Sequence, residues 1–399
     1  MAVDIFADLE ATFRDKGSRE AIDHLCNHLR STGDYQALFY ALLVKGRHDL
    51  GVSPMPTGSA EELPASVHEP YEEVIRNAAR EVGGLFLAAN NLPQAWPYFR
   101  MIGEKEPIFS ALEAANPAED DDIQPLIQVA FYEEVHPGKG FEWILGRYGL
   151  CSAITTLSSG ELPHGEAMRQ ECIRKLVRAL YAELHGRLLA DIEHRDGPVR
   201  AESRLDPSQP GALTRLLEGR DHLFTEETYH IDLSHLSSVV QMSMLLPHCP
   251  ELEMARELCL YGSKLTGRFM GRPDDPPFDQ GYRDYGVYLA ILAGDKVDEG
   301  LAHFHRKARE ADPEEIGTYP AEVLINLLIK LGRNQEALEA AEEFLSREDL
   351  QGRQFSCPGL QELCQKHRDF PRLVRLSRKW RDPVHFLAGL VAGQEPKKP

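Results

Sequence analysis

The sequence has few cysteines, a shortage of basic residues and no long apolar run, and each shortage excludes a class of protein. Its seven cysteines are scattered and odd in number, with no Cys-x-x-Cys pair, which disfavours a disulfide framework and a structural zinc site. They indicate reduced thiols, so we expect a cytoplasmic protein. No stretch reaches the length of a membrane span, and the N-terminal stretch lacks the pattern of a signal peptide. We therefore expect no membrane partner.

The shortage of bases bears on nucleic-acid binding. There are 44 Lys and Arg residues against 63 Asp and Glu, which gives a formal net charge of −19. A surface of that charge repels phosphate backbones. A basic stretch, Lys366–Arg381, carries seven basic residues, and we interpret it as a solvated helix face in an acidic protein. We expect no nucleic-acid partner.

Strand patterns are missing as well. No stretch sustains the alternation of apolar and polar residues that a half-buried strand requires, whereas helical spacing is common. The longest case is Gly165–Glu193, where the apolar positions form one stripe made of Met168, Cys172, Leu176, Leu180, Leu184, Leu188 and Ile192. The sequence therefore predicts an all-α fold.

Three segments repeat one spacing of a turn residue, a small residue, an aromatic residue and a proline. The spacing is carried by Asn90, Ala95, Phe99 and Pro107, by Gly294, Phe304, Ala308 and Pro313, and by Gly332, Ala337 and Ala341. The second segment has one extra residue after its glycine, and the third has alanine at the aromatic position. These segments, best over Tyr285–Leu345, resemble tetratricopeptide repeats. The resemblance implies stacked antiparallel helix pairs that form a curved solenoid with a concave binding face.

The resemblance also suggests a division of the chain. Residues 131–283 depart from the repeat spacing, so we expect an α-solenoid with an elaborated central helical region. We predict N-terminal helical repeats over 1–130, a central region over 131–283 that carries the candidate site, and C-terminal repeat-like helix pairs over 284–399. The stretch Leu50–Pro70 has four prolines and no periodicity, which predicts a long loop within the first part.

Polar residues are dense in Glu226–Leu246, immediately before an apolar helix. We take His230, Asp232 and His235 as a candidate site at the entrance of that helix, with Tyr229 as a substrate contact. Two imidazoles and a carboxylate are the ligand set of non-haem iron, and they also suit zinc or manganese. The same histidines can instead act in acid–base chemistry without a metal. As a third alternative, Asp232 caps the helix by accepting from the N–H of His235 and the histidines serve packing.

Two other polar stretches join the candidate list. In Phe131–Tyr148, Glu133 and His136 are catalytic candidates, and Lys139 or Arg147 would hold an anion near a glycine-rich turn. The alternative is a plain helix–helix connection with Lys139 exposed. In Phe278–Tyr288, Tyr282 and Asp284 suit recognition of a polar, ring-shaped ligand. We interpret the neighbouring Tyr285 and Tyr288 as core positions of a repeat.

Two classes of function fit these observations. The polar residues cluster in a few non-repeating stretches, which favours a small-molecule-binding α-solenoid, and more specifically an enzyme. Its chemistry would be acid–base or metal-assisted, and no motif selects among a lyase, an isomerase, a hydrolase and an oxygenase. The alternative is a non-catalytic interaction module that binds a protein or peptide partner on its concave face.

Overall fold

The computed structural model describes residues 4–55, 63–159, 165–199, 206–225, 229–266, 274–312, 314–347, 350 and 353–394. Helices account for 73% of the chain, and no strand occurs in the described ranges, which confirms the predicted all-α class. Within the same ranges, no helix combines the length and the apolar character needed to cross a bilayer.

The chain divides into two compact units, Met1–Cys172 and Ile173–Pro399. The first unit contains α1 (Ile5–Lys16), α2 (Ser18–Thr32), α3 (Tyr35–Asp49), η2 (Ala65–Val67), α4 (His68–Ala88), α5 (Leu92–Met101), α6 (Glu106–Ala114), α7 (Gln124–Ile127), η3 (Gln128–Tyr132) and α8 (Pro137–Ser158). The long helix α9 (Glu166–Asp196) begins in the first unit and continues into the second. The predicted three-part division at 130 and 283 is not tested by these units and stays a prediction.

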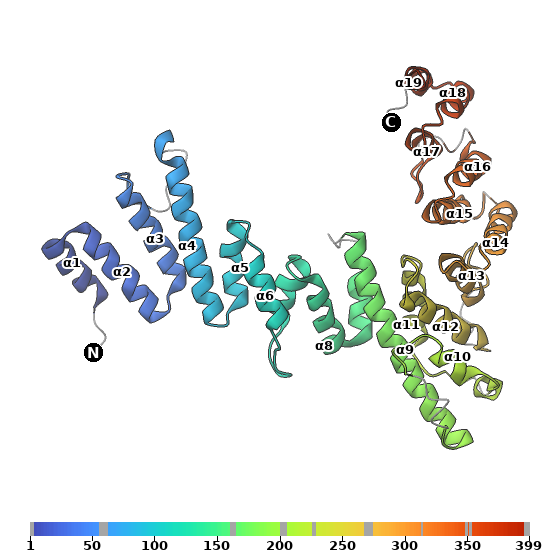
Figure 1. Ribbon diagram of the computed structural model, residues 1–399, viewed down its shortest axis with the longest axis horizontal. Coiled ribbons are helices and arrows are strands. Elements are labelled where there is room, and N and C mark those ends of the chain that lie inside the picture. Colours follow the sequence, from blue (N-terminus) through green and yellow to red (C-terminus); the bar gives the residue numbers. More distant parts are fainter. Residues whose placement is uncertain are drawn as a thin grey trace. The chain divides into compact units, whose positions relative to one another are not determined.

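The second unit continues with shorter helices. They are α10 (Ala212–Leu217), η5 (Asp221–Phe224), α11 (Leu233–Ser243), α12 (Pro250–Lys264), α13 (Tyr282–Leu292), α14 (Val297–Glu310), α15 (Tyr319–Lys330), α16 (Asn334–Leu345), α17 (Leu360–Lys366), α18 (Phe370–Lys379) and α19 (Pro383–Ala392). In both units the most extensive contacts join helices that are consecutive in the sequence, as Figure 1 shows for α1 to α5 and for α12 to α19.

A turn with one left-handed residue joins many of these consecutive helices. The N–H of that residue bonds to the carbonyl three residues back, and the following N–H bonds to the carbonyl five back, which is the Schellman pattern. The geometry recurs at Gly33, Asn90, Gly103, Gly294, Gly332, Arg368 and Arg381. The next residue often caps the following helix, as Asp34, Asn91 and Asp369 do. As few as two residues therefore reverse the chain.

The repeat spacing seen in the sequence corresponds to close helix packing after these turns. Ala95 and Ala337 are fully buried five residues after their turn residues, where a small side chain lets the helices approach. Gly300 holds the same place in α14, since a Cβ there would lie 2.5 Å from a side-chain carbon of Ile291. The extra residue after Gly294 is Lys296, which adopts a second left-handed conformation (φ 48°) in a longer turn. Pro313 lies outside the described residues.

The apolar stripe predicted for the longest helix is the buried side of α9. The prediction of Gly165–Glu193 differs from the observed bounds by a few residues at the C-terminal end. The stripe positions from Cys172 to Ile192 are fully buried. The predicted loop over Leu50–Pro70 contains η2 and the first residues of α4, and its residues 56–62 lie outside the described part of the chain.

Candidate functional site

A groove of about 750 Å³ lies along α12 and α13 in the second unit. Its lining comes from the start of α10, from one side of α12 and from one side of α13: Pro210, Gly211, Thr214, Glu253, Arg256, Glu257, Cys259, Leu260, Ser263, Tyr282, Arg283, Gly286, Val287 and Ala290. Of the residues predicted from the sequence, Tyr282 contributes directly to this lining.

The apolar wall of the groove depends on glycines that let α12 and α13 pack closely. A Cβ at Gly262 would lie 2.5 Å from ring atoms of Tyr282, so the ring rests directly on the α12 backbone. A Cβ added at Gly286 would lie 3.7 Å from Cβ of Cys259, which is an ordinary contact. Because glycine has no side chain, this part of the groove, its floor, stays open. Burial raises the pKa of Tyr282, so its phenol stays neutral at physiological pH. The wall thus combines an aromatic ring with aliphatic side chains, including Leu260.

Glu257 lies at the edge of the groove, but its carboxylate is already fully engaged. It accepts hydrogen bonds from the Tyr181 hydroxyl at 2.9 Å and from the Thr214 N–H at 2.8 Å, and it contacts the Gly211 N–H. The Tyr181 hydroxyl in turn accepts from the Leu213 N–H at 3.0 Å. These bonds satisfy N–H groups at the start of α10 that have no partner within the helix. Glu257 therefore holds α10 in place.

The remaining charges in the groove differ in whether they have partners. Arg256 pairs with Glu253 at 2.8 Å and with Asp295 at 2.7 Å. Arg283 is exposed, and its guanidinium makes no hydrogen bond or ion pair with any residue in the described ranges. The charge that the groove offers to a ligand is thus a single cation beside an apolar wall.

His230 lies in a separate, buried cluster on the other side of α12. It is 7% exposed, and its Nε2 is 3.0 Å from Oδ2 of Asp191, which projects from α9. Its Nδ1 is 3.1 Å from the hydroxyl of Tyr261, and that hydroxyl also accepts from the His230 backbone N–H at 2.8 Å. Because an ionised carboxylate only accepts, Nε2 carries the hydrogen, and Nδ1 then accepts from Tyr261. Both ring nitrogens are satisfied inside the protein.

The electrostatics of this cluster favour a fixed arrangement. Burial would raise the pKa of Asp191, but hydrogen bonds from Arg195 and His230 outweigh it and lower the pKa below its usual value. Burial raises the pKa of Tyr261 to about 12. At neutral pH the His230 ring therefore lies between a carboxylate and a neutral phenol. The arrangement can orient the imidazole, because each of its nitrogens has one partner.

Asp232 and His235 do not join this cluster. Asp232 caps α11, since its carboxylate accepts from the Ser234 N–H at 2.8 Å and from the His235 N–H at 3.4 Å. This is the capping role predicted as an alternative. The Ser234 hydroxyl also donates to the Asp232 carboxylate at 2.6 Å, and this bond, followed by the one from the Ser234 N–H, lowers the pKa of Asp232. Tyr229 is more than half exposed. In the described part of the chain, no group of three His, Cys, Asp or Glu side chains is placed to hold a metal. Iron, zinc or manganese at His230, Asp232 and His235 stays a prediction.

Glu133 and His136 belong to the first unit. Glu133 accepts from the Trp96 indole N–H at 2.7 Å and pairs with Arg100 at 2.6 Å. His136 is the N-cap residue of α8, contacts the Glu113 carboxylate and stacks on Phe109 with ring centroids 4.3 Å apart. The catalytic role predicted for these two residues is untested, and each has a structural partner.

The anion site predicted nearby is also built from engaged residues. The ammonium of Lys139 lies 5.9 Å from the ring centroid of Trp143, and Arg147 donates to the carbonyl of Ala118. The glycines of this stretch face protein: a Cβ at Gly140 would lie 2.7 Å from the backbone nitrogen of Phe131. Close packing of α8 on η3 therefore accounts for Gly140.

Asp284, predicted to contact substrate, is 1% exposed. Its carboxylate accepts from the Gln280 N–H, from His303 Nε2 and from the Lys307 ammonium, each at 2.8 Å. Lys307 is also buried and reaches Asp279 at 2.6 Å. Arg283, which precedes Asp284 in the sequence, is the residue that faces the groove.

Sequence reasoning missed Asp191, Tyr261, Glu257 and Arg283. The first three act through partners far away in the sequence, which no local pattern reveals. Arg283 lies within Phe278–Tyr288, between the candidates Tyr282 and Asp284 at the start of a helix. That position was the sequence signal that could have pointed to Arg283 as a ligand contact.

The chain was compared with protein-family models, with curated proteins and with solved structures, and none of the three comparisons gave a significant match.

Proposed function

We propose that this chain is a tetratricopeptide-like α-solenoid with an elaborated centre, which binds a small anionic ligand in the groove of α12 and α13. The solenoid is supported by the extensive packing of consecutive helices and by the recurring Schellman turns between them. A groove of about 750 Å³ is in the size range of small-molecule sites. The ligand would combine a carboxylate or phosphate with an apolar portion.

The observation that carries this proposal is the unpaired guanidinium of Arg283 beside an apolar wall. The other charged side chains of the groove have partners: Arg256 pairs with Glu253, and Glu257 accepts from α10. An arginine can bind a carboxylate or phosphate through two parallel hydrogen bonds. Tyr282 and Leu260 supply the surface against which an apolar ligand portion would pack.

The geometry supports binding more directly than catalysis. His230 is buried, and both of its ring nitrogens are bonded to Asp191 and Tyr261. Acid–base use of the predicted histidines would need a ligand at His230, His235 or His136, and the groove is lined by none of them. An enzyme with a reaction at those residues stays a prediction without further support.

A matched ligand screen tests the proposal. Saturation-transfer NMR would compare apolar carboxylic acids with their primary amides, which have nearly the same shape and no charge. We expect the acids to give signals and the amides to give weaker ones or none. Arg283→Ala should remove the preference for acids, and Gly286→Leu should reduce binding of both forms by filling the groove floor.

Arg14→Ala is the matched control, because Arg14 is an exposed arginine in the first unit. It should leave every signal unchanged. Equal binding of acids and amides, or an acid preference that survives Arg283→Ala, would contradict the proposal. All variants should first show unchanged far-UV circular dichroism.

A further inference from the structure

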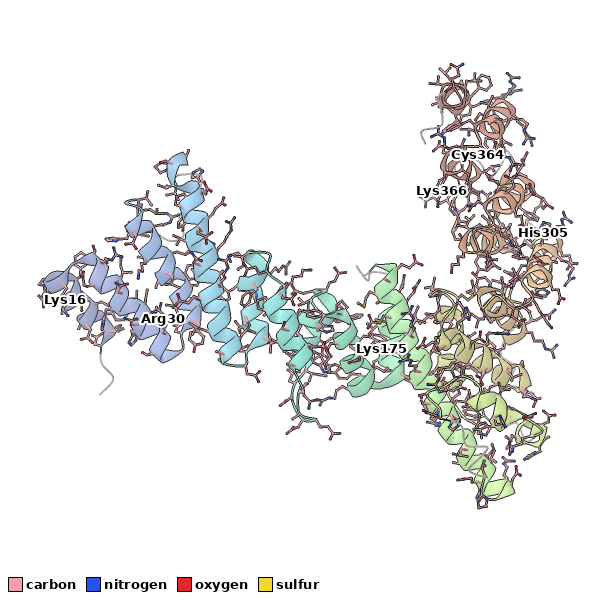
Figure 2. All side chains as sticks on the ribbon, viewed as in Figure 1. Lys16, Arg30, Lys175, His305, Cys364 and Lys366 are labelled. Carbon is pink, nitrogen blue, oxygen red and sulfur yellow. The ribbon has the colours of Figure 1, made fainter. Side chains whose placement is uncertain are left out.

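A second groove, of about 640 Å³, is formed by the end of α16, the connection to α17, the first turn of α17 and the turn after α18. It shares no lining residue with the groove of α12 and α13. Figure 2 labels Cys364 and Lys366 on α17, the helix whose beginning contributes to this groove. Leu345 and Leu360 give it a buried aliphatic base. The groove therefore has the size and the apolar base of a small-molecule site.

The connection between α16 and α17 is tied to α15. Ser356 donates from its N–H and from its hydroxyl to the buried carboxylate of Glu322, each at 2.6 Å. The Ser356 carbonyl accepts from the Asn326 amide at 3.0 Å. These bonds hold the backbone between Phe355 and Cys357, and both of those side chains line the groove. A ligand would thus meet a wall that is already in place, which lowers the cost of binding.

Trp380 supplies a further aromatic surface. Its indole N–H donates to the carbonyl of Ser346 at 3.0 Å, which fixes the ring and satisfies its one polar atom. Burial raises the pKa of the Cys357 thiol to about 12, so that side chain stays uncharged at neutral pH. Phe355, Trp380 and Cys357 therefore line the groove with surface that suits an apolar group.

The groove has three charged side chains among the described residues, and one of them is engaged. The carboxylate of Asp382 accepts from the His385 N–H at 3.1 Å, from its ring Nδ1 at 2.6 Å and from the Gln361 amide at 3.3 Å. Arg353 and Glu362 are exposed. Neither the guanidinium nor the carboxylate bonds to the other, or to any other residue that the structure describes. One groove thus offers a ligand both a base and an acid.

We propose that this groove binds a small zwitterion with an apolar side chain, for which an apolar α-amino acid such as leucine is the model. Arg353 would bind the carboxylate through two parallel hydrogen bonds, and Glu362 would accept from the ammonium group. The side chain would pack against Phe355 and Trp380. An anion or a cation alone would leave one of the two charged residues without a partner. The proposal is independent of the ligand in the groove of α12 and α13.

The fluorescence of Trp380 tests the location of the site. The chain has three tryptophans, and the other two, Trp96 and Trp143, belong to the first unit. L-Leucine should change the fluorescence of the full chain in a saturable way. Trp380→Phe keeps an aromatic ring in the groove but removes the indole, so it should abolish the change. The proposal is overturned if the wild type shows no saturable change, or if the change persists in Trp380→Phe.

Three further compounds test the chemistry of the ligand. The first, 4-methylpentanoate, is leucine without its amino group, and the second, 3-methylbutylamine, is leucine without its carboxylate. Each should bind about tenfold more weakly than leucine or worse, because one charge-assisted hydrogen bond is lost. L-Alanine keeps both charges, and it should also bind about tenfold more weakly because its side chain covers less apolar surface. Equal binding of all four compounds would overturn the proposal.

Two substitutions assign the two charges. Arg353→Met should weaken leucine and 4-methylpentanoate and leave 3-methylbutylamine unchanged, whereas Glu362→Gln should weaken leucine and 3-methylbutylamine and leave 4-methylpentanoate unchanged. Arg14→Met and Glu10→Gln, at exposed positions of α1, are matched controls and should change nothing. An affinity for leucine that is the same in the wild type, Arg353→Met and Glu362→Gln would overturn the assignment.

Arg283→Ala separates this site from the groove of α12 and α13. It should leave the affinity for leucine unchanged, even if it removes the binding of apolar acids there. A loss of leucine binding in Arg283→Ala but not in Arg353→Met would overturn the proposal. Far-UV circular dichroism should first confirm that every variant is folded.

Discussion

Leu260 and Tyr261 are neighbours in α12, and Arg283 and Asp284 are neighbours in α13, yet the members of each pair have opposite surroundings. Leu260 and Arg283 face the groove, whereas Tyr261 and Asp284 are buried and hydrogen-bonded. The buried side has the residue types that suggest chemistry, namely histidine, aspartate and tyrosine. The open side has few such residues. Dense polar sequence in this protein therefore marks internal hydrogen-bond networks, and a charge without a partner marks the surface available to a ligand.

The largest effect is expected where Asp284, on the buried side of α13, loses a charged partner on α14. Lys307→Met removes the ammonium that pairs with Asp284 and leaves a buried carboxylate with fewer partners. Breaking a buried ion pair in this way costs about 3–5 kcal/mol. Arg283→Met, on the open side of the same helix, should cost less than about 0.5 kcal/mol. Urea unfolding followed by circular dichroism compares the two. Equal losses would break the contrast between the sides.

Removal of one hydroxyl on the buried side of α12 should have the next largest effect. Tyr261→Phe leaves the His230 N–H and Nδ1 without their partner. An unsatisfied buried polar group costs about 1–3 kcal/mol, so we expect a loss of at least about 2 kcal/mol for the two. Tyr40→Phe is a suitable control because Tyr40 is 47% exposed. A loss for Tyr261→Phe no larger than that of the control would show that the His230 cluster adds no stability.

Two glycines that meet the groove should respond in opposite directions. Gly262→Ala would place a Cβ 2.5 Å from the ring of Tyr282, and such overpacking costs about 1–3 kcal/mol. Gly286→Ala has space and should be neutral or stabilise α13 by up to about 1 kcal/mol. Thermal unfolding of the two variants measures the difference. If Gly262→Ala is tolerated as well as Gly286→Ala, the close packing of Tyr282 on α12 is wrong.

The smallest effect concerns a buried imidazole, one of whose nitrogens has no hydrogen-bond partner among the described residues. Burial lowers the pKa of His185, on α9, and its Nε2 makes no hydrogen bond. Between the usual pKa of histidine, about 6.5, and the lower folded value, the unfolded chain binds more protons. His185 therefore lowers stability as the pH falls through that window. The unfolding free energy of His185→Leu should change less than that of the wild type between pH 7.5 and 5.5. An identical pH dependence in both would contradict this.

The helices could be predicted because the signals that form them are local. The stripe of α9 recurs every three or four residues, and Asp232 caps α11 through bonds that reach only three residues ahead. Turns at Arg368 and Arg381 were missed, because arginine seldom adopts the left-handed conformation that glycine and asparagine adopt readily.

The candidate sites were harder to predict, because their partners are distant in the sequence. His230 bonds to Asp191 across 39 residues, and Tyr181 bonds to Glu257 across 76. A single sequence contains no sign of such pairings. The residues of Glu226–Leu246 were therefore grouped by their closeness in the chain, and the structure instead brings His230 to α9 and α12 while Asp232 stays on α11.

The short turns between consecutive helices have a consequence for the speed of folding. Contacts between neighbouring helices close small loops, and domains dominated by such local contacts fold in microseconds to milliseconds. The hydrogen bonds of His230 and Glu257 are exceptions, because each requires a loop of tens of residues to close first. We therefore expect the helices from α13 to α19 to form early, and the region from α9 to α12 to become native last. The slowest step in folding would then be the one that assembles the buried wall behind the groove.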